Sequence, residues 1–169
     1  MSQWEPVRPK DLEGNFFTRI GEDWMLIGAA KGDTVNMMTA SWGGIGIYWG
    51  KPVAYCYIRP QRHTKGFVDA ADGLSLTFFP HEYRAQLQLC GSKSGRDVDK
   101  VQECGFHVLW EEGIPYFDEA DTALICKPLI AQPLDPDYFR DPGLQPSAYP
   151  DGDFHTLYIC EIVKALAKK

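Results

Sequence analysis

The segment WMLIGAAKGDTVNMMTASW (residues 24–42) indicates the fold class most directly. Its two apolar halves, 24–30 and 35–42, are rich in strand-forming residues, and a short polar turn with Gly32 separates them. The stretch therefore predicts an antiparallel hairpin. Strand alternation in its second half predicts two faces: Asn36, Met38, Ala40 and Trp42 on one, Thr39 and Ser41 on the other.

Four further apolar runs predict strands: 53–58, 74–79, 123–130 and 157–166. Short helices are predicted between them, one after an N-cap at Thr64, one over 81–90 and one over 97–104 with Ser94 ahead of it. The Pro-, Gly- and Asp-rich segments 111–121 and 132–153 predict loops. This pattern favours a mainly β fold, a closed six-stranded antiparallel barrel with short helices packed outside it, with a twisted open sheet as the alternative.

The length of 169 residues predicts one domain, 1–169. The longest apolar run is far too short to span a bilayer, and the charged N-terminal stretch does not resemble an export signal. Five cysteines without C-x-x-C spacing predict free, buried thiols, and the four scattered histidines predict no metal site. We therefore expect a cytoplasmic protein that does not bind membranes.

The charge distribution predicts a site for a small anion. A net charge of −6 argues against nucleic acid as a partner. Residues 51–68, however, carry four basic side chains and no acidic one. Within it, Arg59 and Arg62 precede a predicted helix start, where forked donors and free N–H groups suit a phosphate. The alternative is that both arginines pair with acids on the surface.

Two other segments could line a ligand site. Small residues near the end of the strand 35–42 would let a flat ligand approach the backbone, with Asn36 and Ser41 as donors and Trp42 packed on a ring. The alternative is an ordinary barrel strand with its polar residues in solvent. The segment 90–100 offers Ser94 and Lys100 around a helix start, and the alternative is an ordinary helix start without a ligand.

Three motifs carry a family resemblance: N-x-M-T-A-S-W at 36–42, R-P-x-R-x-T at 59–64 and C-G-x-x-S-G-R-D-x-D-K at 90–100. Together they resemble the flavin reductase-like family of FMN-binding split-barrel proteins, and the flavoredoxin branch in particular. The resemblance implies a homodimer with FMN near its interface. The residues that it implies for FMN binding are Asn36, Thr39, Ala40, Ser41, Trp42, Arg59, Arg62, His63, Thr64, Ser94 and Lys100, with His63 where the family often has Tyr.

The function implied is an FMN-dependent oxidoreductase, in which NAD(P)H passes hydride to flavin N5. The alternative is an electron carrier that a redox protein reduces, and a third reading is a dimeric binding module without cofactor. The sequence shows no acid–base dyad, and none is needed, because the cofactor supplies the hydride chemistry. His155, in a C-terminal segment similar to the family's ending, either orients a nicotinamide or is a buried strand histidine.

Overall fold

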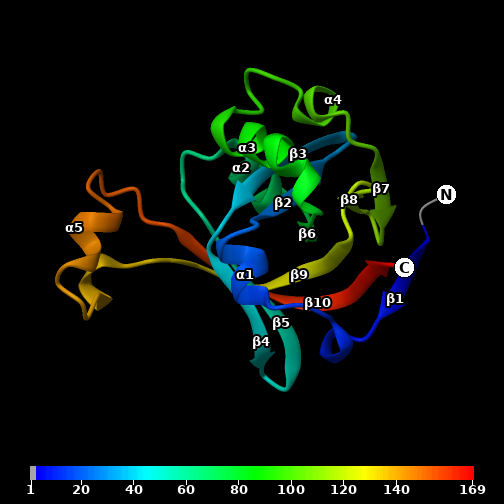
Figure 1. Ribbon diagram of the computed structural model, residues 1–169. Helices are drawn as coiled ribbons and strands as arrows, with labels where there is room; N and C mark the ends of the chain where they lie inside the picture. Colours follow the sequence, from blue (N-terminus) through cyan, green and yellow to red (C-terminus); the bar gives the residue numbers. More distant parts are fainter. Residues whose placement is uncertain (1–2) are drawn as a thin grey trace.

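The computed structural model describes residues 3–169, and its centre is an antiparallel sheet (Figure 1). The strands pair in the order β3-β2-β6-β9-β10-β5-β4, and β1 pairs with β10. Their bounds are β1 Trp4–Val7, β2 Met25–Lys31, β3 Thr34–Ala40, β4 Gly43–Tyr48, β5 Lys51–Ile58, β6 Leu74–Phe78, β9 Thr122–Pro133 and β10 Thr156–Lys168.

The predicted hairpin is confirmed. Strands β2 and β3 pair antiparallel from Met25↔Ala40 to Lys31↔Thr34, and Gly32 takes the positive φ of 59° that the turn requires. The other four predicted runs correspond to β5, β6, β9 and β10. The mainly β, antiparallel fold with short helices is therefore confirmed.

The structure adds strands that the sequence pattern did not indicate. The sheet contains β1 and β4, and a separate hairpin pairs β7 (Val108–Glu111) with β8 (Ile114–Phe117). The segment 111–121, predicted as a loop, therefore includes β8. Glu112 and Gly113 have φ values of 51° and 77°, so their left-handed conformations make the tight turn of this hairpin.

The connection between β3 and β4 positions the site. These two strands are the ends of the pairing order in the described chain, yet only Ser41 and Trp42 separate them in sequence. Because so short a link spans about 10 Å at most, the sheet must curl until its ends approach each other there. Ser41 and Trp42 thus lie at the seam of the curled sheet.

The described residues form three apolar clusters, and two of them lie on opposite faces of the hairpin. Met25 and Ile27 of β2 contribute to the cluster enclosed by the sheet, whereas Leu26 packs beneath the helices. Both faces of this strand are therefore buried from Met25 to Ala29, which explains why its sequence has no polar side chain before Lys31. The five cysteines are free and buried, as predicted.

Eight short helical elements accompany the sheet in the described residues. They are η1 Pro9–Asp11, α1 Phe16–Gly21, α2 His63–Ala70, η2 His81–Tyr83, α3 Arg84–Ser92, α4 Lys100–Cys104, η3 Pro136–Tyr138 and α5 Leu144–Ala148. Between residues 3 and 169 no helix is long and apolar enough to cross a membrane. Figure 1 shows the segment with α5, from the region predicted as the loop 132–153, extending away from the sheet.

Two predicted helix caps are wrong. Thr64 lies inside α2, whose N-cap is Arg62 without a side-chain bond, because Thr64 is buried against the sheet. Helix α4 begins later than predicted, at an N-cap formed by Asp99, whose side chain accepts a hydrogen bond from Gln102 N at 3.1 Å. Its predicted stop, Gly105, is confirmed with a φ of 67°.

Candidate functional site

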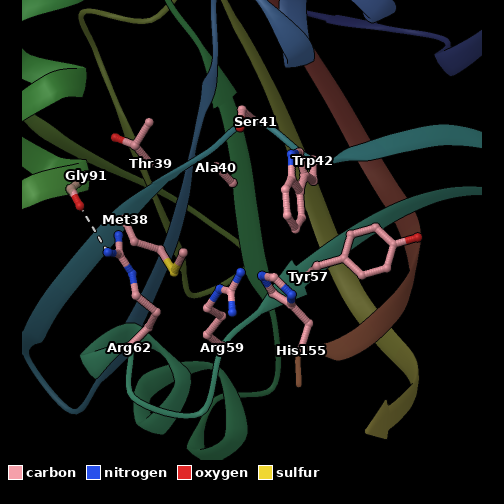
Figure 2. Close-up of a pocket in the computed structure, with 10 residues that line it drawn as sticks. All are labelled: Met38, Thr39, Ala40, Ser41, Trp42, Tyr57, Arg59, Arg62, Gly91 and His155. Carbon is pink, nitrogen blue, oxygen red and sulfur yellow. Dashed lines mark hydrogen bonds between the residues drawn. The ribbon is translucent and has the colours of Figure 1, made fainter. Parts of the chain in front are cut away.

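A cavity of about 250 Å³ lies at the seam of the curled sheet, and we call it the strand-end cavity (Figure 2). Strand β3 and its continuation supply one wall, and the others come from β5, the start of α2, the end of α3 and the start of β10. It is lined by Met38, Thr39, Ala40, Ser41, Trp42, Tyr57, Arg59, Arg62, Gly91 and His155.

The wall between β3 and α3 is closely packed. The Thr39 hydroxyl donates a hydrogen bond to the Leu87 carbonyl, so it is committed to holding α3. Gly91 approaches so closely that a Cβ there would lie 3.3 Å from Thr39 Cβ. The absence of a side chain at Gly91 therefore keeps this end of the cavity open.

Arg62 brings into the cavity a positive charge that no carboxylate of the described residues compensates. Its Nη1 donates to the Gly91 carbonyl at 3.0 Å, and no carboxylate forms an ion pair with it in the described part of the chain. Burial lowers the pKa of the guanidinium from its ordinary value. A half-buried cation with donors to spare favours an anionic ligand.

Arg59 is held differently. Its Nη1 lies 2.7 Å from the Asp153 carboxylate, and its Nη2 donates to the Ala148 carbonyl at 3.0 Å. The guanidinium also lies 5.0 Å from the centre of the Tyr149 ring. The surface ion pair considered as the alternative for this arginine is therefore present, and it ties the segment with α5 to the edge of the cavity.

The opposite end of the cavity is aromatic. The His155 ring lies 5.2 Å from that of Trp42, and its Nδ1 is 2.7 Å from the Tyr149 hydroxyl. Burial, assisted by the positive charge of Arg59 and opposed by Asp153, lowers the pKa of His155 to about 4. The imidazole is therefore neutral at pH 7, while half-exposed Trp42 remains accessible.

Five predicted residues lie outside the strand-end cavity. Asn36 and Thr64 are buried and bonded to each other, with 2.9 Å between Asn36 Nδ2 and Thr64 Oγ1. Lys100 donates to two buried carbonyls, and burial lowers its pKa to about 8. Ser94 Oγ accepts a hydrogen bond from Arg96 N at 3.2 Å. These four side chains have partners within the protein.

His63, the fifth, lines a cavity of about 440 Å³ that adjoins the first one at Arg62. We call it the cationic cavity, because its lining includes Lys31, Lys65 and Arg96 besides Arg62. Among its described lining residues Asp69 supplies the one carboxylate, which Lys65 contacts at 2.6 Å and to which the Tyr158 hydroxyl donates a hydrogen bond. Arg62 therefore links an aromatic cavity to a positively charged one.

Three lining residues, Met38, Tyr57 and Gly91, were not predicted from the sequence, and neither was the role of Asp153. Tyr57 could have been found, because alternation along 53–58 places it opposite the fully buried Cys56 and Ile58. Asp153 could not, because nothing local in the sequence pairs it with Arg59.

Comparison with known proteins gives a family assignment. The flavin reductase like domain model matches residues 17–169. No curated protein matches the chain significantly. Among solved structures, an FMN-binding domain of a flavin reductases-like enzyme from Shewanella baltica is similar, with a TM-score of 0.70 and 18% identity over 98% of this chain and 78% of that one.

Two further structures are similar in fold. A flavoredoxin from Methanosarcina acetivorans has a TM-score of 0.68 and 19% identity, over 87% of this chain and 69% of that one. An FMN-binding protein from Thermus thermophilus has a TM-score of 0.67 and 24% identity, over 84% and 69%. Since the family model covers most of the sequence and the fold agrees, the chain belongs to the flavin reductase like domain family.

Proposed function

We propose that this protein is an FMN-dependent oxidoreductase that accepts hydride from NAD(P)H. The observation that carries the proposal is Arg62, a half-buried guanidinium that no described carboxylate neutralises and that joins the strand-end cavity to the cationic cavity. The similar proteins from Shewanella baltica and Thermus thermophilus are described as FMN-binding, which supports the choice of FMN.

The residues present fit the two halves of FMN. Its phosphate dianion suits the cationic cavity, where Arg62 and the cations around His63 would hold it. Its flat ring suits the strand-end cavity, where Trp42 offers an aromatic face and Ser41 a hydroxyl. Gly91 leaves room beside Thr39 that a larger residue would fill. In this proposal Asn36, Thr64, Ser94 and Lys100 support the site from behind through their internal hydrogen bonds.

The chemistry supplied by bound FMN is reversible two-electron transfer. The chain's own residues bind and orient. His155, neutral at pH 7 and held by the Tyr149 hydroxyl, keeps the aromatic end rigid, and the Arg59–Asp153 pair anchors the segment that borders it. No proton transfer by the protein is required.

We also propose that the chain acts as one domain in a cytoplasmic homodimer. Exposed apolar side chains gather on and next to β4, namely Trp42, Ile47, Tyr48 and Trp49, and burying them against a second copy would remove them from water. Five free thiols favour a reducing compartment such as the cytoplasm. Size-exclusion chromatography with light scattering tests the dimer.

The first experiment is an absorption spectrum of the purified protein before and after NADH or NADPH is added without oxygen. Flavin bands that bleach support the proposed reductase, and chromatography of the released cofactor should identify FMN rather than FAD. Bands that bleach with dithionite but with neither nicotinamide would support the electron carrier instead. A colourless protein that takes up no added FMN would contradict both.

A second experiment tests the phosphate site. Arg62→Ala should weaken FMN binding by roughly tenfold to a hundredfold, because a charge-assisted hydrogen bond contributes about 1.5–3 kcal/mol. Binding of riboflavin, which has no phosphate, should change little. Arg8→Ala is the matched control, since Arg8 is the exposed N-cap residue of η1 and lines neither cavity. Equal losses for FMN and riboflavin would show that Arg62 does not bind phosphate.

A further inference from the structure

Two cysteines from neighbouring helices contact each other beside the site. Cys90 lies in α3 and Cys104 is the last residue of α4, and their sulfur atoms are 3.5 Å apart. Cys90 is fully buried, whereas Cys104 is 9% exposed. The proposed function uses neither thiol.

The two thiols differ in acidity. The pKa of Cys104 is lowered, first by the hydrogen bond from the Cys90 thiol and then by the positive charge of Lys100, against the effects of burial and of Glu103. The thiols of Cys56 and Cys126, buried in the sheet, have raised pKa values. Since the thiolate is the nucleophile, Cys104 is the more reactive position.

The geometry allows the sulfurs to join. A disulfide requires a separation near 2.05 Å, so the pair must close by about 1.5 Å. Helix α4 has only five residues, and the left-handed Gly105 follows Cys104 directly. The closing movement would therefore fall on a short helix end and not on a strand of the sheet.

We propose that Cys90 and Cys104 are a redox-active pair that hydrogen peroxide converts reversibly into an intramolecular disulfide. The Cys104 thiolate attacks one peroxide oxygen, the O–O bond breaks, and the hydroxide released takes up a proton to become water. The Cys90 sulfur then attacks the Cys104 sulfenic acid, the S–O bond breaks, and a second water leaves. In total two thiols lose two electrons and two protons, and one peroxide becomes two waters.

The pair lies where oxidation would reach the cavity wall. The Cys90 carbonyl accepts a hydrogen bond from Lys100 Nζ at 2.9 Å, and the carbonyl of the next residue, Gly91, accepts one from Arg62. A disulfide at Cys90 therefore constrains the backbone that positions Arg62. This consequence follows from the contacts of the chain and does not depend on which ligand the cavity binds.

The test uses the whole protein, treated with hydrogen peroxide and then denatured for thiol counting. Of the five thiols in the sequence, two should be lost, leaving three. Peptide mapping without reductant should show Cys90 linked to Cys104, and dithiothreitol should restore all five. Because the tryptic peptide with Cys104 also contains Cys126, fragmentation must assign the linked sulfur.

Variants separate the roles of the two thiols. Cys104→Ser should retain its remaining thiols, and Cys90→Ser should accumulate a sulfenic acid on Cys104 that dimedone traps. Cys126→Ala, the matched control, should still lose two thiols. Five unreacted thiols in the native protein, or a disulfide between any other pair, would overturn the proposal, and mapping of the native protein decides this even if a variant fails to fold.

Discussion

Asn36 Nδ2 donates a hydrogen bond of 2.9 Å to Thr64 Oγ1, and both side chains are almost completely buried. The bond joins β3 to α2. It therefore connects the strand that lines the strand-end cavity to the helix whose first turn lines the cationic cavity. Each residue belongs to a motif for which the sequence predicted a ligand contact. Their first role in the structure is to hold these two segments together.

Thr64→Val tests this role, because valine keeps the shape of threonine and removes the hydrogen-bond acceptor. The buried Asn36 amide then has no partner at this position, which should lower the free energy of unfolding by about 1–3 kcal/mol. Urea titration measures the change. Thr34→Val is the control, since Thr34 is exposed at the start of β3, the strand that contains Asn36. The stability of this variant should stay within about 0.5 kcal/mol of that of the native protein. Equal effects of the two substitutions would contradict the structural role.

Two glycines give opposite predictions for the same substitution. A Cβ on Gly95 would lie 2.2 Å from Oδ1 of the buried Asn36, so Gly95→Ala should destabilise the protein by about 1–3 kcal/mol. A Cβ on Gly66, inside α2, would meet no atom within 4 Å, so Gly66→Ala should stabilise the protein by up to about 1 kcal/mol. Thermal unfolding of the two variants tests both signs, and a neutral Gly95→Ala would show that Asn36 can move aside.

The strands could be predicted from sequence where the apolar pattern was continuous. The pattern failed for β4, whose Gly43, Gly44 and Gly46 lack the side chains that signal a strand, and whose Ile47 is exposed. It also failed for β8, because Glu112 and Gly113 indicate a turn but not the pairing on either side of it. The local sequence pattern does not indicate which strand an edge strand pairs with.

The position of the site could be predicted from the sequence, but the ion pairing of its arginines could not. The seam residues Ser41 and Trp42 do line the cavity, and so does Arg62. Arg59 resembles Arg62 in sequence, yet Asp153 neutralises it from a segment about 90 residues away. Only the fold distinguishes the two arginines, because a distant segment of the chain decides whether the charge of each is neutralised.

Acid stability should report the buried imidazole of His155. Its pKa is lowered to about 4, so between about pH 6.5 and pH 4 the unfolded chain binds a proton that the folded protein does not. The free energy of unfolding should therefore fall as the pH is lowered through this range. His155→Asn removes the titrating group and should reduce the fall by up to about 3 kcal/mol.

Unfolding titrations of both proteins across that pH range provide the measurement, and the difference between them cancels the contribution of the carboxylates. NMR of the imidazole carbon-bound protons gives the pKa directly. An imidazole that titrates near 6.5 in the folded protein would contradict the buried, neutral His155.

The buried side chain of Lys100 gives a prediction for the stability of the protein at alkaline pH. Its Nζ donates to the carbonyls of Met37 and Cys90 at 2.9 Å each, and burial lowers its pKa from 10.5 to about 8. Between these values the unfolded chain holds a proton that the folded protein has released, so this residue makes the free energy of unfolding rise with pH. The free energy of unfolding of the native protein, relative to that of Lys100→Met, should therefore increase by up to about 3 kcal/mol between about pH 8 and about pH 10.5. Lys93→Met, an exposed lysine at the end of α3, is the control and should show a constant difference across the same urea titrations. A difference for Lys100→Met that is equally flat would mean that Lys100 keeps its charge inside the protein, and that the two carbonyls alone compensate for its burial.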